Sequence, residues 1–228
     1  MKDIANMGLL EGSFIKELKN RFLCEVKINN ESVVCYVPSS CHIGNFLQLE
    51  GKRVLLMPSQ GSKTRTPYAL FAVPFKKSFI LLNSSIANKA IEVSIKSRKF
   101  YFLGKRSDVV REHNVAGYRA DLFLPSTKTI IEVKSVISLN ERATFPTVFS
   151  ERTLKQLDTI LKYLKSGYKA CFMIVSLHPY LKSIELDVKS EFYALIVKCI
   201  DLGMILKAYT CRLKDNSIII EKEIPVII

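Results

Sequence analysis

The residues best suited to chemistry in this sequence are two carboxylates and a lysine, Asp121, Glu132 and Lys134. Two apolar runs, residues 118–124 and 129–135, flank a Pro-Ser-Thr-Lys segment that is typical of a tight turn. If the Ser-Thr pair forms a two-residue hairpin loop, Asp121 faces Glu132, and facing side chains have Cβ atoms about 4.5–5.5 Å apart. Lys134 then lies on the same face as Glu132, because side chains alternate along a strand.

Two facing carboxylates need a compensating cation, because like charges directly opposed destabilise a sheet. Mg²⁺ and Mn²⁺ bind through one or two carboxylates together with water and phosphate oxygens. A lysine beside them can orient an attacking water or stabilise charge that develops on phosphate. The alternatives are a solvent-facing hairpin with a cross-strand salt bridge, in which Lys134 itself is the cation, and a register shifted by one residue.

The elements that must position these residues divide the chain into two predicted domains. Residues 1–82 contain short apolar stretches with basic connections, and this spacing predicts a small antiparallel barrel. Residues 83–228 alternate helices and strands, which indicates an α/β domain. We expect strands at 21–28, 31–37, 52–57, 68–75, 109–113, 118–124, 129–135, 168–177 and 204–213, helices at 84–95 and 187–202, and a long loop from 136 to 150.

The clearest helix follows Ser150, which suits an N-cap, and ends before Gly167, which suits the C′ position. Its leucines and isoleucine recur at helical spacing and predict a buried face: Leu154, Leu157, Ile160, Leu161 and Leu164. Arg152, Lys155, Thr159 and Lys162 form a mostly basic stripe opposite them. Such stripes are usually solvated, but one that begins at a helix N-terminus is also a candidate phosphate contact.

Charge and composition indicate the class of partner. The 228 residues carry a formal net charge of +13, and 48% are hydrophobic, which excludes a disordered chain. A basic globular protein most often binds nucleic acid, with anionic membrane surfaces second. We expect no membrane partner, because no apolar run approaches the roughly 20 residues that span a bilayer, and the basic amphipathic helix with an exposed apolar face that a membrane-surface protein would need is not found. Six scattered cysteines without a CxxC pair, and no signal-peptide pattern, predict a cytoplasmic protein.

The pattern of Asp121 followed by Glu132-Val-Lys134 resembles the core of the PD-(D/E)XK nuclease superfamily. Wider stretches are similar to the sugar fermentation stimulation protein (SfsA) family, over most of the chain. These stretches are Tyr118-Arg-Ala-Asp-Leu, Ile131-Glu-Val-Lys-Ser-Val, Phe145-Pro and Ser150-Glu-Arg-Thr-Leu-Lys-Gln-Leu. The resemblance implies an N-terminal OB-like barrel followed by a restriction-endonuclease-like α/β domain with a central mixed sheet.

The resemblance also implies a Mg²⁺- or Mn²⁺-dependent nuclease that acts on DNA, with RNA as a further candidate substrate. It assigns Asp121 and Glu132 to the metal, Lys134 to catalysis, and Glu112 to the place of a third acid, with a plain strand-end charge as the alternative. The rival function is a non-cleaving DNA-binding regulator of sugar catabolism on the same scaffold, because a fold does not guarantee its chemistry. The oligomeric state is left open, a dimer included.

The sequence departs from the family pattern at three places. Gln156 replaces the family's helix histidine, so it can position water or phosphate by hydrogen bonds but cannot act as a general base. Thr153 replaces a glycine, and Pro38-Ser39-Ser40-Cys41 replaces a Pro-Asn-Thr-Gly turn. The ligand surface of the first domain is therefore less well supported by the resemblance than the metal site.

Seven cations are candidates for nucleic-acid contact: Arg21, Arg53, Lys63, Arg65, Arg119, Arg152 and Lys155. Several of them flank aromatic residues of the first domain, Tyr68, Phe71 and Phe75. Accessible aromatics beside cations are typical of OB-like faces that bind single strands. The same three rings are also consistent with a barrel core, and the sequence leaves both readings open.

Overall fold

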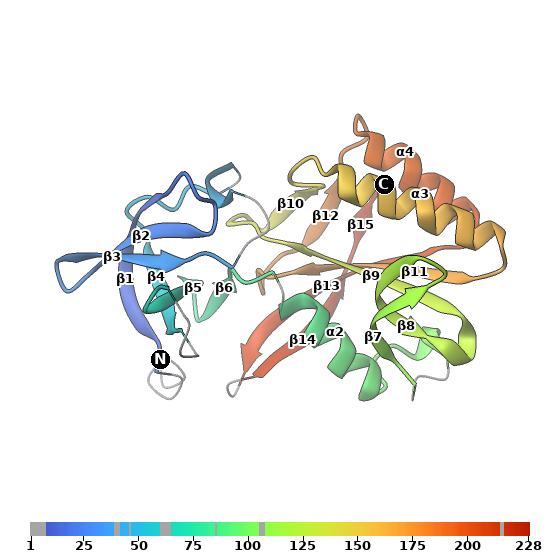
Figure 1. Cartoon of the computed structure of the whole chain (residues 1–228), viewed down its shortest axis with the longest axis horizontal. Helices are drawn as coiled ribbons and strands as arrows, with labels where there is room; N and C mark the ends of the chain where they lie inside the picture. The colour runs from blue at the N-terminus through green and yellow to red at the C-terminus, as the bar shows by residue number, and fades with distance from the viewer. Residues whose placement is uncertain are drawn as a thin grey trace.

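The computed structural model describes residues 8–38, 42–45, 47–59, 65–84, 86–104, 108–214 and 217–228. Figure 1 shows a strand-rich N-terminal part beside a larger C-terminal part in which helices cover a sheet. No helix among the described residues combines the length and the apolar character needed to cross a bilayer.

The N-terminal part is a closed OB-like barrel, as predicted. Its strands are β1 (Leu10–Glu17), β2 (Leu23–Ile28), β3 (Glu31–Tyr36), β4 (Arg53–Pro58) and β5 (Tyr68–Phe75), followed by β6 (Ser78–Leu81), with a short η1 turn (Ile43–Asn45). The order is β3-β2-β1-β4-β5-β6, and a parallel contact between Tyr36 and Ala69 closes β3 onto β5. Closure removes the free edges that an open sheet would expose.

The central strand β1 was not predicted from the sequence. Its glycine explains why it fits: a Cβ built on Gly12 would lie 2.5 Å from Val26 Cγ1 and 3.0 Å from the Lys27 carbonyl oxygen. Glycine lowers the strand signal of a segment, yet here it permits close approach of the neighbouring strand.

The C-terminal part contains a six-stranded mixed sheet, which confirms the predicted architecture. It comprises α2 (Ile86–Lys96), η2 (Tyr101–Leu103), β7 (Val110–Val115), β8 (Tyr118–Leu124), η3 (Pro125–Thr127), β9 (Thr129–Val136), β10 (Arg142–Phe145), α3 (Glu151–Lys165), β11 (Lys169–Ser176), β12 (Ser183–Leu186), α4 (Glu191–Asp201), β13 (Ile205–Lys214), β14 (Ser217–Ile224) and β15 (Val226–Ile227). The order is β14-β13-β11-β9-β8-β7, with β9, β11 and β13 parallel. In Figure 1, α2 lies on one side of this sheet and α3 with α4 on the other.

The expected loop from 136 to 150 is wrong in its middle, because it contains β10. This strand pairs in parallel with β12, and β12 pairs with β15, so the three form a second small sheet. Four residues are too few to show the alternation that identifies a strand. Their partner strand comes much later in the chain, so no local pattern indicates the pairing.

The helix α3 begins and ends as its sequence predicts. The Ser150 hydroxyl oxygen accepts a hydrogen bond from the Thr153 backbone N–H at 3.2 Å, which is the N-cap contact. Gly167 follows the last turn with φ +84°, a left-handed conformation that favours glycine. Leu157 and Ile160 are buried against the sheet, in the apolar cluster that also contains Phe172 of β11.

The two parts of the chain are joined by packing and by charge. A single apolar cluster runs from the barrel into one face of the large sheet. The rings of Phe75 and His178 lie 4.7 Å apart between centroids, and Glu141 contacts both Lys76 and Lys182, the latter at 2.6 Å. The barrel is therefore anchored to the domain that carries the acidic residues.

Candidate active site

The hairpin of β8 and β9 has the predicted register. The ladder runs from the pair Leu122–Ile131 to the pair Leu124–Thr129. The connection is a 3₁₀ turn closed by the Lys128 N–H, which donates to the Pro125 carbonyl oxygen at 3.2 Å. Lys128 adopts a left-handed conformation with φ +50°. The turn differs from a simple two-residue loop, but it leaves the facing positions unchanged.

Asp121 lies one position beyond the Leu122–Ile131 pair of that ladder, at the position that faces Glu132 on the neighbouring strand. Its Oδ2 accepts a hydrogen bond from the Val133 backbone N–H at 2.9 Å. Within the described residues, Asp121 Oδ1 has no hydrogen-bond partner. The contact fixes Asp121 across the hairpin and leaves one carboxylate oxygen for another ligand.

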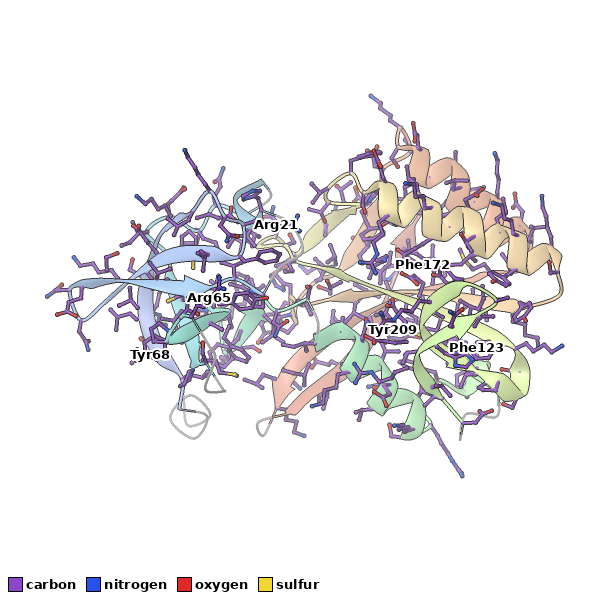
Figure 2. The ribbon with its side chains drawn as sticks, in the orientation of Figure 1. Arg21, Arg65, Tyr68, Phe123, Phe172 and Tyr209 are labelled. Carbon is purple, nitrogen blue, oxygen red and sulfur yellow. The ribbon has the colours of Figure 1, made fainter. Side chains whose placement is uncertain are left out.

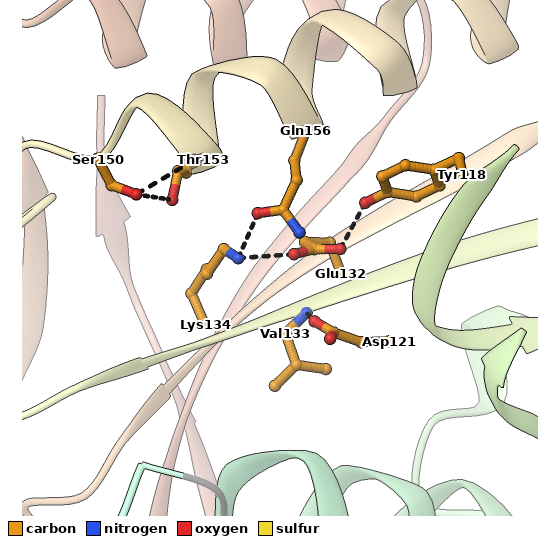
Figure 3. A network of polar contacts seen from close by, with 8 residues as sticks. All are labelled: Tyr118, Asp121, Glu132, Val133, Lys134, Ser150, Thr153 and Gln156. Atoms are coloured by element: carbon orange, nitrogen blue, oxygen red, sulfur yellow. Dashed lines mark hydrogen bonds and ion pairs between the residues drawn. The ribbon is translucent and has the colours of Figure 1, made fainter. Parts of the chain in front are cut away.

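Glu132 is the centre of a polar network between β9, β8 and α3, drawn in Figure 3. Its side chain is fully buried. The Tyr118 hydroxyl donates to Oε2 at 2.6 Å, and the Lys134 ammonium donates to Oε1 at 2.6 Å. The same ammonium donates to Gln156 Oε1 on α3, also at 2.6 Å. Both oxygens of the buried carboxylate are therefore held by donors from different elements.

Burial raises the pKa of Glu132, since a charged carboxylate is poorly solvated there, and the nearby Asp121 charge raises this pKa further. The Lys134 ammonium and the Tyr118 hydroxyl oppose this shift by stabilising the carboxylate. Burial and the Glu132 carboxylate also raise the pKa of Tyr118, which keeps its hydroxyl protonated and able to donate. The network is thus a buried acid whose charge depends on a cation beside it.

The donor set is compatible with a hard divalent cation. In the parts of the chain that are described, no group of three or more His, Cys, Asp or Glu side chains could hold a metal ion. Two carboxylates are nevertheless enough for Mg²⁺ or Mn²⁺, which retain several waters and use substrate phosphate as a ligand. A dication at Asp121 and Glu132 would also supply the charge that Lys134 now provides.

Glu112 lies on β7 at the position that faces Asp121 on β8, but its carboxylate does not join the hydrogen-bond network of Glu132. The pairs Arg111–Leu122 and His113–Ala120 place it opposite Asp121, so three acids occupy facing positions on β7, β8 and β9. The Glu112 backbone has φ +47°, and its exposed carboxylate is bonded to the Arg119 guanidinium. In the structure Glu112 and Arg119 therefore neutralise each other at the surface.

The other predicted cations lie in different settings. Arg152 and Lys155 are exposed on the first turns of α3, the helix that carries Gln156. Arg53 of β4 pairs with Glu11 of β1 at 3.5 Å. Lys63 and Ser39-Ser40-Cys41 lie outside the described residues. The first-domain aromatics belong to the core: Phe71 is buried, and Tyr68 and Phe75 pack against the same cluster. The stacking prediction is therefore wrong for Phe71, whereas Tyr68 and Phe75 are half-buried and stacking on them stays a prediction.

Tyr118 is a member of the network that the sequence reasoning missed. It lies in a largely apolar strand, and its side chain is buried, including the hydroxyl that donates to Glu132. A buried tyrosine hydroxyl normally has a hydrogen-bond partner. A tyrosine three residues before a candidate metal aspartate is therefore a signal that could have identified it.

Comparisons with known proteins agree with this architecture. The family described as SfsA N-terminal OB domain matches residues 18–82, and the family described as Sugar fermentation stimulation protein RE domain matches residues 85–217. A sugar fermentation stimulation protein homolog of Pelagibacter ubique is 27% identical, with 96% of this chain and 97% of that protein covered. One of Clostridium kluyveri is 29% identical, with 98% and 99% covered.

A solved structure has the same fold. It is the structure of Pyrococcus furiosus SfsA in complex with Ca²⁺, with a TM-score of 0.81 and 20% sequence identity, and it covers 96% of both chains. The similarity therefore extends over both the barrel and the mixed-sheet domain.

Proposed function

Because the chain belongs to the sugar fermentation stimulation protein (SfsA) family, we propose that it is a metal-dependent nuclease that hydrolyses phosphodiester bonds of DNA. RNA is the second substrate to test. The observation that carries the proposal is the buried Glu132 in line with Asp121 and bonded to Lys134. This is the residue set of the PD-(D/E)XK pattern, and a buried Glu132 beside the half-buried Asp121 is costly in a protein that merely attracts phosphate.

Asp121 and Glu132 are the residues that would hold Mg²⁺ or Mn²⁺. The Pyrococcus furiosus protein was solved with Ca²⁺, which prefers oxygen ligands as Mg²⁺ and Mn²⁺ do, and this supports a divalent ion here. When bound, such an ion supplies Lewis acidity toward a phosphoryl oxygen and lowers the pKa of a water molecule.

The protein's own groups act around these acids. Lys134 can orient the attacking water or stabilise charge on the phosphoryl oxygen, because its ammonium carries three donors. Gln156 holds that ammonium and offers an amide N–H₂ to water or phosphate. Tyr118 fixes the orientation of Glu132. Glu112 would serve as a third acid after leaving Arg119, which would then be available to phosphate.

Nucleic acid is proposed to bind across both domains, in the cytoplasm. Arg152 and Lys155 stand at the N-terminal end of α3, where backbone N–H groups also favour phosphate. Arg21, Arg53 and Arg65 would extend the positive surface over the barrel, and Lys63, outside the described residues, stays a candidate from the sequence. The overall charge of +13 supports this, since counterion release drives binding to nucleic acid.

A non-cleaving DNA-binding regulator of sugar catabolism is the second candidate. One observation favours it: the Lys134 ammonium already compensates the charge of the buried Glu132 at 2.6 Å, so this carboxylate is paired without a metal. This candidate predicts binding that depends on salt but not on metal, and no cleavage.

Cleavage of single- and double-stranded DNA and RNA in Mn²⁺ and Mg²⁺ tests the proposal. Asp121→Asn and Glu132→Gln keep the side-chain shape and remove a metal-ligand charge, so we expect at least a 100-fold loss of rate. Asp158→Asn is the matched control, because Asp158 is an exposed carboxylate on α3 that pairs with Lys162 at 2.9 Å. Absence of cleavage by the wild-type protein, or full activity of Asp121→Asn, would exclude the nuclease and favour the regulator.

A further inference from the structure

A pocket on the barrel is lined by aromatic rings that the core does not use. Its volume is about 540 Å³. Its lining comes from four segments: Asn20 and Phe22 in the connection before β2, Leu23 on β2, Val34 and Tyr36 on β3, and Ser59, Arg65 and Thr66 in the connection between β4 and β5. We call it the aromatic pocket.

The two rings of the aromatic pocket are exposed and nearly parallel. Phe22 is 36% and Tyr36 is 41% exposed. Their ring planes are 17° apart, and their centroids are separated by 6.3 Å. Leu23 faces Tyr36 in the β2–β3 ladder and adds an apolar floor. Both aromatic side chains of the pocket are therefore partly exposed to solvent, whereas Phe71 is buried in the core.

The backbone holds Phe22 in place on both sides. Its N–H donates to Asn20 Oδ1 at 3.1 Å, and its carbonyl oxygen accepts a hydrogen bond from the Val37 N–H at 2.8 Å. Because this backbone is already fixed, a ligand that stacks on the ring has to order only the Phe22 side chain, which favours binding.

Positive charge lies next to these rings. The Arg21 guanidinium carbon is 4.8 Å from the centroid of the Phe22 ring, and Arg65 is exposed at the lining. Within the described ranges neither arginine pairs with a carboxylate, unlike Arg53. Glu25, on the outer side of β2, is paired with Lys16 at 3.6 Å. Figure 2 labels both arginines on the barrel. The pocket thus combines ring faces with uncompensated cations.

We propose that the aromatic pocket binds an unpaired base of single-stranded nucleic acid. The base would stack on Phe22 or Tyr36, and Arg21 and Arg65 would contact the flanking phosphates. OB folds bind oligonucleotides through strands 2 and 3 and through the loops after strands 1 and 4, which are the segments that line this pocket. Ring faces select unpaired bases, because a base in a duplex is stacked on its neighbours and has no free face.

This inference rests on the proposed function for its substrate class, but it concerns a different surface from that of Asp121 and Glu132. It predicts that substrates containing a single-stranded segment bind better than fully paired duplexes.

A fluorescent reporter tests stacking directly. The chain has no tryptophan, so Phe22→Trp introduces a single indole into the pocket, which can be excited at wavelengths that its nine tyrosines do not absorb. We expect saturable quenching by an oligothymidylate of about ten nucleotides, measured in EDTA so that no metal-dependent cleavage occurs. Tyr101→Trp is the control, because Tyr101 is 84% exposed on η2 of the other domain. Absence of quenching in Phe22→Trp, or equal quenching in both variants, would overturn the proposal.

Affinity measurements give the second readout. Phe22→Ala and Tyr36→Ala are each expected to weaken oligothymidylate binding about tenfold, because stacking contributes on the order of that factor per base. Binding of a duplex of equal length should change less than about twofold, and Tyr36→Phe should bind as the wild type does. Unchanged single-strand binding, or an equal loss of affinity for the duplex, would refute the proposal that this pocket binds an unpaired base.

The two proposals fail separately. Both pocket experiments are performed without metal, so their failure leaves the cleavage test of Asp121→Asn unaffected. A protein that binds oligothymidylate through Phe22 but cleaves nothing would retain the pocket and lose the nuclease. Circular dichroism of each variant confirms that it is folded.

Discussion

Removal of one hydroxyl group, in Tyr118→Phe, tests whether Glu132 is positioned for a metal. The Tyr118 hydroxyl donates to Glu132 Oε2 at 2.6 Å in a fully buried setting. Its loss leaves Oε2 without this donor, and hydrogen bonds to charged groups contribute about 1.5–3 kcal/mol. The variant should therefore lose about that free energy of unfolding, with a shift in Tm of about 2–4 °C per kcal/mol for a chain of this size.

The same substitution should weaken metal binding. Without the hydroxyl, the pKa of Glu132 rises further and its carboxylate is less well oriented, so a proton competes better with the metal. Groups that orient a metal ligand typically affect metal affinity about 10–100-fold. We expect the dissociation constant for Mn²⁺, measured by titration calorimetry at fixed pH, to increase by about this factor.

The control is Tyr209→Phe, because the Tyr209 hydroxyl is 3.4 Å from Glu223 Oε2, a second tyrosine–glutamate pair in the same domain. It should lose less stability, since this bond is long, and its Mn²⁺ affinity should equal that of the wild type. If Tyr118→Phe binds Mn²⁺ as tightly as the wild type does, Glu132 is not the ligand that the network suggests.

Three further predictions concern stability. Lys182 and Lys76 hold the pKa of Glu141 at about 2, below its ordinary 4.5, so its stabilisation is present above about pH 4.5 and is lost as the pH falls toward 2. The Tm of the wild type should therefore fall more steeply with falling pH over this range than the Tm of Glu141→Gln. Equal slopes of Tm against pH would contradict a stabilising role of the Glu141 ion pairs. Ser150→Ala should cost about 0.5–2 kcal/mol in urea unfolding, and an unchanged midpoint would exclude the cap. Gly12→Ala should cost about 1–3 kcal/mol through its clash with Val26, whereas wild-type stability would show that β2 can shift.

The sequence pattern was sufficient to predict those elements whose bounds and register depend on residues close together in the chain. The apolar runs around the turn predicted the β8–β9 register and hence the line of Asp121 and Glu132. Ser150 and Gly167 predicted both ends of α3. In each case the information lies in side-chain period and in cap or turn residues close together in the chain.

Contacts between distant segments could not be predicted in this way. The sequence contains Lys134 and Gln156, but their contact exists because α3 packs across β9. Nothing in the sequence distinguishes Phe71 from Phe22 in accessibility. Closure of the barrel buries Phe71 and leaves Phe22 exposed.

The sequence by itself therefore determined the residue types of the acidic site, their register and the helix beside them. The tertiary structure alone decided which donors reach Glu132, which cation stands beside it, and which aromatic rings face solvent. The physical reason is that register and capping depend on neighbours in the chain, whereas burial and side-chain pairing depend on how separate elements pack.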